Sequence, residues 1–437
     1  MKCRSYAPTL SLSLALLLSL LFSETTFAQQ QQQQQAAQTT PVIASSARLD
    51  ELRAAGFEAL YNLDYEGARR QFKEIVRLFP DHPAGPQFLA ATLWTQTLNE
   101  SRRLQSSLYN SESFYGKTED QVDPVRVEQF RELTRAAILL AKARIRANPR
   151  DTEAIYFLGA TEGLKAAFAA AVQRSFRSAL SDGSNSVDRH REVIKLDPTF
   201  HDAELTIGLY DYVVGTLPLP VKVLATLGGV RGSKKRGLLT LERVTREGRY
   251  ARDDARALLI VLYKREKRLQ DALAMSNELA ARYPRNYLFK LESADALMSQ
   301  AALERAANNL TTAGSAEREA LAIFDALLQD RAVRERAARS LDLIHFRYGD
   351  ALFIAGRFDQ AAREFLASAA VSGAEPGLAT LARLRAAQAL DIAGKRNEAL
   401  IQYRTVLQRP DVYNAHEEAK RGLREPYKIR NEKSSSE

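Results

Sequence analysis

The segment from Asp50 to His82 constrains the fold most strongly, because it encodes two helices that cannot bury their apolar faces alone. The first face comprises Leu52, Ala55, Gly56 and Leu60, and the second comprises Ala68, Phe72 and Ile75. A break at 62–64 separates the two helices, and Pro80 ends the second, because proline lacks an N–H group and clashes with the preceding turn. The pair therefore needs neighbours of the same kind along the chain.

The same pattern recurs: a small residue, a bulkier one four positions later, and a break about twelve positions later. The small, bulky and break positions are Ala68, Phe72, Pro80; Ala137, Ala141, Pro149; Ser186, His190, Pro198; Gly237, Leu241, Gly248; Ala272, Ser276, Pro284; Ala320, Phe324, Asp330; Ala361, Phe365, Gly373; and Ala399, Tyr403, Pro410. Small or aliphatic residues stand at matching places in the preceding helices, namely Gly56, Gly159, Gly208, Ile260, Gly349 and Ala387. These positions predict close approach of paired helix backbones.

These positions resemble the tetratricopeptide repeat family, whose helix-turn-helix unit repeats every 34 residues. The matching residues include Gly56, Tyr65, Ala68, Phe72 and Pro80, and also Leu259, Tyr263, Ala272 and Pro284. The resemblance implies an all-α fold, a right-handed superhelical α-solenoid of about eight repeats over residues 47–425. It also implies that the second helices hold the repeats together, that the first helices line a concave face, and that contacts link neighbouring repeats. Ala415–Leu423 is predicted to be a capping helix, followed by a polar tail at 426–437.

A narrower resemblance covers residues 207–241, IGLYDYVVGTLPLPVKVLATLGGVRGSKKRGLLTL. The segment is similar to the eukaryotic tetratricopeptide repeat protein 39 and fungal inclusion-body clearance group. Those proteins would have Asp-Arg where this chain has Ser233-Lys234, so only the architecture is carried over. The apolar part, 217–230, is interpreted either as a buried helix or as a contact with a partner or membrane surface, helped by Arg231 and Lys234 to Arg236.

The N-terminus has the pattern of a secretory signal peptide over residues 1–28. Lys2 and Arg4 precede an apolar run at 10–22, and Thr26-Phe27-Ala28 provides a cleavage site after Ala28. The alternative is an uncleaved membrane anchor, but the run is short for a bilayer span. The Gln-rich stretch at 29–46 is predicted to be a disordered linker. We therefore expect a secreted bacterial type of protein, located in the periplasm or cell envelope or secreted.

Catalytic and metal-binding patterns are not recognisable, and we predict neither an enzyme nor a cofactor or metal. The only cysteine, Cys3, lies in the signal, and the five histidines lack metal-ligand spacing. Paired carboxylates such as Asp253-Asp254 are predicted to lie on a helix surface. The net charge of +9 is spread among 62 basic residues rather than concentrated, so a nucleic-acid partner is not expected.

A binding groove is the remaining candidate for function. By repeat position, the concave face would include Arg53, Phe57, Tyr61, Tyr156, Lys264, Arg265, Phe346, Arg347 and Phe353. Aromatic and arginine side chains are common interface anchors, although the same residues could simply pack between repeats. The residues at 105–125 are either a surface loop or a docking loop. We expect a non-enzymatic exported scaffold for protein–protein interaction that binds a protein or peptide. The alternative is a lipid- or membrane-surface-associated envelope protein that uses 217–230.

Overall fold

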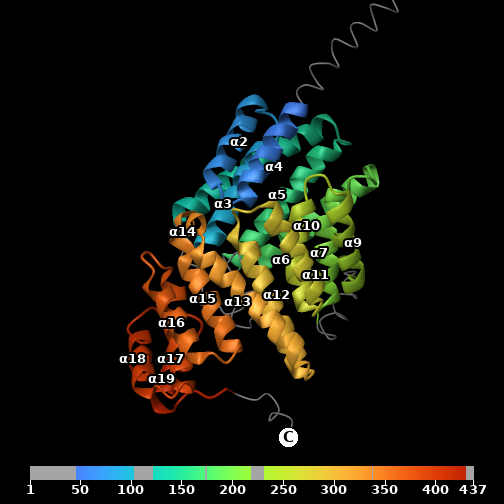
Figure 1. Cartoon of the computed structure of the whole chain (residues 1–437). Coiled ribbons are helices and arrows are strands. Elements are labelled where there is room, and N and C mark those ends of the chain that lie inside the picture. The colour runs from blue at the N-terminus through green and yellow to red at the C-terminus, as the bar shows by residue number, and fades with distance from the viewer. Residues whose placement is uncertain (1–45, 103–121, 173–174, 218–230, 337, 430–437) are drawn as a thin grey trace, which may run out of the picture.

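The computed structural model describes residues 46–102, 122–172, 175–217, 231–336 and 338–429, and within them the chain is helical and contains no strand (Figure 1). The predicted signal peptide, nearly all of the Gln-rich linker, and most of 105–125, 217–230 and the tail lie outside these residues. No helix in the described part of the chain combines the length and apolarity that crossing a bilayer requires.

The first half of the chain consists of consecutive helices. A first helix spans residues 46–61. It is followed by α2 (Tyr65–Leu78), α3 (Ala84–Glu100), α4 (Pro124–Ala147), α5 (Thr152–Ala171), α6 (Phe176–Leu196), the 3₁₀ turn η3 (His201–Ala203), α7 (Glu204–Gly215), α9 (Lys234–Glu247), α10 (Arg252–Arg265) and α11 (Leu269–Arg282).

The second half continues in the same manner. Its elements are α12 (Tyr287–Ala306), α13 (Leu310–Gln329), α14 (Arg331–Arg336), η4 (Ala338–Ser340), α15 (Leu341–Ile354), α16 (Phe358–Ala370), α17 (Pro376–Ile392), α18 (Arg396–Val406) and α19 (Ala415–Arg424). Over the described residues the successive pairs are the first helix with α2, then α3–α4, α5–α6, α7–α9, α10–α11, α12–α13, α15–α16 and α17–α18. The predicted α-solenoid of helix-turn-helix repeats is confirmed.

The small and bulky positions predicted from the sequence form the contact within each pair. Ala68, Phe72, Ala361 and Phe365 are all fully buried. A Cβ atom added to Gly56 would stand 2.2 Å from Cε1 of Phe72. The same substitution at Gly349 would place a Cβ 2.7 Å from Cδ1 of Phe365, and at Gly159 one 2.8 Å from Nε2 of His190. At these three positions, the bulky side chain of the second helix lies too close to the first helix for any residue other than glycine.

The predicted helix ends are also confirmed. α2, α4, α6 and α11 each stop two residues before the predicted proline, since the residue preceding proline is disfavoured in the helical conformation. At the N-termini, aspartate side chains accept backbone N–H groups: Asp64 from Gly67 at 2.8 Å and Asp151 from Ala154 at 2.9 Å. These caps mark the starts of α2 and α5.

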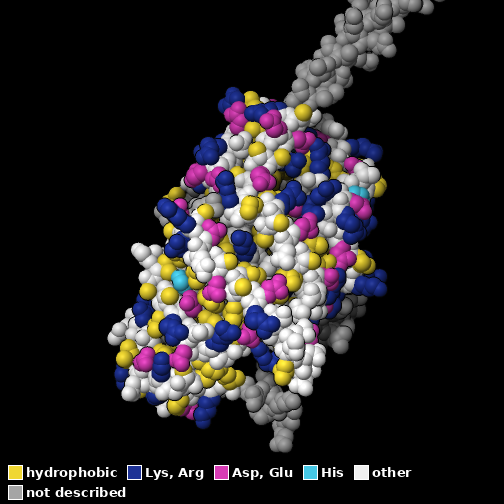
Figure 2. Space-filling model, in the orientation of Figure 1, with side chains coloured by type: hydrophobic (Ala, Val, Ile, Leu, Met, Phe, Trp, Pro, Cys, Tyr) yellow, Lys and Arg dark blue, Asp and Glu magenta, His cyan; other side chains and the backbone are white. Residues whose placement is uncertain are grey.

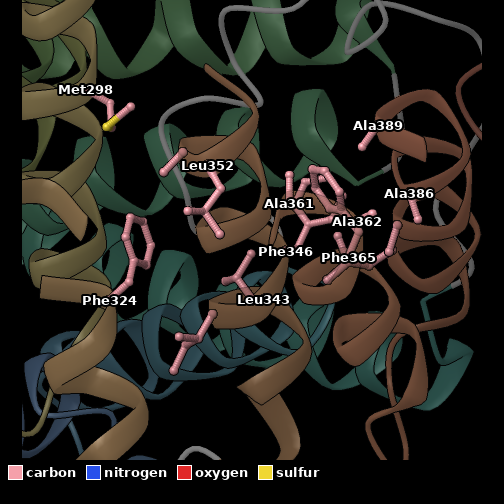
Figure 3. Packing of buried hydrophobic residues seen from close by; sticks show 14 of the residues in the cluster. Met298, Phe324, Leu343, Phe346, Leu352, Ala361, Ala362, Phe365, Ala386 and Ala389 are labelled. Atoms are coloured by element: carbon pink, nitrogen blue, oxygen red, sulfur yellow. The ribbon is translucent and has the colours of Figure 1, made fainter. Parts of the chain in front are cut away.

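The largest hydrophobic core lies in the C-terminal half and runs from α12 to α19. In Figure 3, Phe346 of α15 and Phe365 of α16 point toward one another, with Ala361 and Ala362 beside them. Their rings are 5.5 Å apart in an edge-to-face arrangement. The capping helix α19 covers this end, since Gly422 lies directly against the Tyr403 ring.

The solenoid closes upon itself in the N-terminal half, which corrects the expectation that contacts link only neighbouring repeats. The backbone carbonyl of Tyr61 accepts a hydrogen bond from Asn286 at 2.7 Å, across 225 residues of sequence. Tyr61 also stacks on Tyr283 with ring centroids 5.0 Å apart, and Arg249 binds Asp50. The first helix is thereby joined to α10, α11 and α12, because the superhelix completes a turn over these repeats.

The face shown in Figure 2 carries lysine, arginine, aspartate and glutamate side chains that are interspersed rather than separated by sign. Several charged side chains of the protein pair with a residue three positions away, such as Arg77 with Glu74 and Arg268 with Asp271. Exposed pairs of this kind contribute at most about 1 kcal/mol each. The basic side chains on this face are therefore scattered over a solvated surface and do not form a concentrated stripe.

Candidate functional site

The closure encloses a chamber of about 730 Å³, which is the candidate functional site. Its lining comes from the first helices of six successive repeats, namely the helix at 46–61, α3, α5, α7, α10 and α12. One second helix, α6, also contributes, through residues that include Val187 and His190. Most of the lining is apolar. The first helices thus form most of the chamber wall, and α6 is the exception among the described second helices.

Aromatic rings form a continuous wall of the chamber. Phe57 contacts Phe88 with ring centroids 4.9 Å apart, and Phe88 contacts Phe157 at 5.7 Å. Phe157 is 5.4 Å from Tyr156, which lies 6.2 Å from Tyr250. The repeat periodicity places these residues on four different helices or loops that meet only in the closed superhelix. The wall offers a broad apolar surface with a few hydroxyl groups.

A carboxyl group lies at the closed end. Asp254, in the first turn of α10, accepts a hydrogen bond from the hydroxyl of Tyr61. The pKa of Asp254 is raised to about 6, mainly by burial and also by the neighbouring carboxylates of Asp253 and Asp202, while the Tyr61 hydrogen bond lowers it. Asp254 nevertheless keeps accessible surface, because it lines the chamber. A ligand inside can therefore reach this group.

The chamber is acidic within a basic protein. Asp202, Asp254 and Glu292 line it, whereas no lysine or arginine stands among the described lining residues. Glu292 pairs with Lys264 at 2.8 Å. One oxygen of Asp202 accepts three backbone N–H groups of residues 249–251 at 2.7–2.8 Å. In the described part of the chain, Asp254 has no ion-pair partner. Its carboxylate is therefore available to pair with a positive charge on a ligand.

Two further polar atoms at the wall lack a hydrogen-bond partner among the described residues. They are Oε1 of Gln87 and Nδ1 of His190, and both residues line the chamber. Burial lowers the pKa of His190 to about 4, which keeps its imidazole neutral near pH 7. Its Nε2 lies 3.3 Å from the carbonyl oxygen of Tyr156. Buried polar atoms without partners are uncommon in native proteins, and here both belong to residues that border the chamber.

The chamber opens between α5, α6 and α7. Ala167 and Ser184 are exposed there, and Val213 is 49% exposed. By contrast, Leu60 and Ile260 at the other end are 5% and 2% exposed. The site therefore has an accessible apolar mouth and a closed end that carries Tyr61 and Asp254.

Three of the nine predicted groove residues meet in the chamber: Phe57, Tyr61 and Tyr156. Arg53 lies above the Tyr250 ring, 4.4 Å from its centroid. Arg265 borders a separate cleft of about 390 Å³. Phe57, Tyr61 and Tyr156 meet because they lie on the inner side of two first helices, the helix at 46–61 and α5.

The remaining predicted residues pack between repeats. Lys264 and Arg347 bind opposite oxygens of Asp295, which joins α10, α12 and α15. Phe346 is 8% exposed within the C-terminal core. Phe353 is half-buried, and Arg385 lies 4.4 Å from its ring centroid.

Sequence reasoning missed Asp254 and Trp94, both of which line the chamber. The expectation that Asp253 and Asp254 lie on a helix surface is wrong for Asp253, which is 7% exposed and accepts a hydrogen bond from Tyr283. Asp254 is exposed, and its side chain lines the chamber. Adjacent helical residues diverge, as expected. Within the described ranges, no group of three or more metal-ligating side chains is present.

Comparison with known proteins gives similarity to solved helical structures alone. No family model matches the chain, and no curated protein does. Human IFIT1, solved as a dimer with m7Gppp-AAAA, is 12% identical over 86% of this chain and 85% of its own, with a TM-score of 0.45. The human IFIT1 dimer with PPP-AAAA has a TM-score of 0.44. Yeast Tom70 is 10% identical over 84% of this chain and 86% of its own, with a TM-score of 0.37.

Structural similarities this distant do not indicate the function of the protein. The helix pairs and their small–bulky contacts define an all-α scaffold of helix-turn-helix repeats. Its distinguishing feature is the chamber enclosed by the first helices.

Proposed function

We propose that this protein is an exported, non-enzymatic binding protein that takes an apolar segment of a protein or peptide partner into the chamber. The observation that carries the proposal is the apolar chamber of about 730 Å³. Protein interiors are close-packed, so a space large enough for about 24 waters, at roughly 30 Å³ each, is not a packing defect. Its volume lies in the range of ligand pockets, about 300–1,000 Å³.

The mouth and the wall suit a polypeptide segment with apolar side chains. Such a segment can enter beside Val213 and lay its side chains against the Phe57, Phe88 and Phe157 rings, which bury apolar surface efficiently. A nucleic acid is disfavoured there, because phosphates require cations and the described lining has none.

The partner test uses the mature chain from Gln29 as bait in an envelope extract. Overlapping synthetic peptides of each captured protein are then titrated by fluorescence anisotropy. Ala160→Trp fills the chamber from α5, and Ala143→Trp adds the same bulk on the exposed surface of α4. We expect peptide binding by the wild type and Ala143→Trp and at least about a tenfold loss in Ala160→Trp. Equal binding by all three proteins would refute the chamber as the site.

Export is tested separately, in a Gram-negative host that expresses the full chain. We expect the protein in the periplasmic fraction, with an intact mass that corresponds to cleavage after Ala28. A full-length mass together with cytoplasmic recovery would contradict the export part of the proposal. That outcome would not affect the proposal that the chamber binds a peptide, which the peptide titration tests separately.

A further inference from the structure

We infer that the segment bound in the chamber carries a primary ammonium group, a lysine side chain or a free N-terminus, and that this group pairs with Asp254 at the closed end. The inference rests on the proposed function, because it names the chemistry of the ligand at the same site. Three observations carry it: the sign of the charged residues in the lining, the accessible carboxylate of Asp254, and the rings that surround it.

The charges of the lining select against an anion. The whole chain has a net charge of +9, yet the charged side chains among the described lining residues are the three carboxylates of Asp202, Asp254 and Glu292. Glu292 is paired with Lys264, so the negative potential that repels a ligand carboxylate or phosphate and attracts a cation comes mainly from Asp254 and Asp202. An interior acidic site in a basic protein is the opposite of what a random distribution of charge would produce, so it indicates recognition of positive charge.

Asp254 is the carboxylate that a ligand must compensate. Glu292 has Lys264, and Asp202 has the backbone N–H groups at the start of α10. Asp254 has the hydroxyl of Tyr61 alone among the described contacts. A carboxylate in an apolar enclosure is costly without a paired charge, and an ammonium group offers three donors that restore the balance. A hydroxyl or amide ligand would donate one bond without neutralising the charge.

The rings at the closed end add to the attraction. Tyr61 contacts Asp254 directly, and Tyr156 lies near enough for the Asp254 charge to raise the pKa of its hydroxyl group. Tyr250 lies next to Tyr156, with centroids 6.2 Å apart. Aromatic faces attract cations through their quadrupole, and desolvated sites strengthen this effect. The closed end therefore combines a carboxylate with electron-rich rings, which is the chemistry of an ammonium site.

The chain contains its own reporter for a direct test. Trp94 is the only tryptophan in the sequence, and it lines the chamber next to Phe168, with ring centroids 5.7 Å apart. A ligand that enters changes the environment of this indole, so its emission follows binding without a label. The mature chain is titrated with an acetylated, amidated leucine-rich hexapeptide containing one lysine and with its analogue containing norleucine instead. Dodecylammonium and dodecanoate, below their micelle concentrations, form a second arm.

We expect the lysine peptide to bind at least about tenfold more tightly than the norleucine peptide, the range expected for a hydrogen bond to a charged group. Asp254→Asn should remove this preference, whereas Asp81→Asn, the same change of charge on an exposed residue outside the chamber, should keep it. Far-ultraviolet circular dichroism confirms that both variants are folded. If dodecylammonium binds more tightly than dodecanoate and neither peptide binds, the site takes a small amine. That result would overturn the inference that the ammonium group belongs to a peptide.

The outcomes also separate this inference from the proposed function. Equal binding of the two peptides in wild type and Asp254→Asn, with loss in Ala160→Trp, would overturn the ammonium site and leave the chamber as a binding site. Binding of neither peptide, with no response of Trp94 to either dodecyl compound, would overturn both. Tighter binding of dodecanoate than of dodecylammonium would contradict the charge argument directly.

Discussion

The ion pair between Arg102 and Asp342 gives the sharpest test of the closed architecture. It joins the end of α3 to the start of α15, with Nε of Arg102 2.8 Å from Oδ1 of Asp342, and the two residues are 240 positions apart. Their side chains are 7% and 0% exposed. Asp342 also accepts backbone N–H groups from Leu343 at 2.8 Å and Glu375 at 2.9 Å. An open solenoid would have no contact between these repeats.

Substituting Arg102→Ala leaves the Asp342 carboxylate buried with two backbone donors and no compensating cation. Breaking a buried pair from one side costs about 3–5 kcal/mol. The two N–H groups that remain retain part of the stabilisation, so we expect a value near the lower limit, about 3 kcal/mol. Arg131→Ala is the matched control, because its pair with Glu128 is long, at 3.4 Å, and exposed on both sides. Its loss should cost less than about 1 kcal/mol.

Urea unfolding measures the stability of both variants, and hydrogen exchange with mass spectrometry shows where it is lost. In Arg102→Ala we expect faster amide exchange in α15 and α16, although the substitution lies at the end of α3. In Arg131→Ala exchange in those helices should be unchanged. Faster exchange confined to α3 and α4, or a loss below about 1 kcal/mol, would refute the buried inter-repeat contact.

Three other predictions test the packing and the chamber. Ala68→Asp puts an unpaired charge into a fully buried helix contact and should cost at least about 3 kcal/mol; an unchanged urea midpoint would contradict the register. Gly349→Leu should cost about 1–3 kcal/mol, because its Cβ would stand 2.7 Å from Cδ1 of the buried Phe365; an unaltered melting temperature would be inconsistent with that contact. Burial raises the pKa of Asp254 from 3.8 to about 6, so the folded state retains a proton that the unfolded state releases. The resulting stabilisation is complete below about pH 4 and is lost as pH rises through about 6. Asp254→Asn should reduce the difference between melting temperatures at pH 4.5 and pH 7, and parallel shifts of both proteins would exclude this linkage.

Much of the repeat architecture could be predicted because its signals are local. The contact between Gly56 and Phe72 lies within one pair of helices, and its small–bulky spacing recurs wherever a second helix crosses a first. Proline positions such as Pro80 and Pro284 mark helix ends for steric reasons that act over a few residues. Such signals are readable from one sequence, since each repeat contains both partners of its main contact.

The chamber could be predicted only in part. Phe57, Tyr61 and Tyr156 line it because they occupy the inner face of first helices, which the repeat register predicts. The same register also selects Lys264 and Arg347, but these side chains are neutralised by Asp295 between repeats. A repeat position defines which way a side chain faces, and it contains no information about which distant repeat will cover that face.

The sequence by itself determined the helices, their pairing and the side chains that face inward. Only the tertiary structure decided that the inward faces enclose a chamber, because closure depends on small rotations that accumulate over about 225 residues before Asn286 reaches the carbonyl of Tyr61. That same closure brings Asp254, one of two adjacent acidic residues on a helix, to the hydroxyl of Tyr61 in the lining of the chamber. Its chemistry is thus a property of the closed superhelix and not of its own repeat.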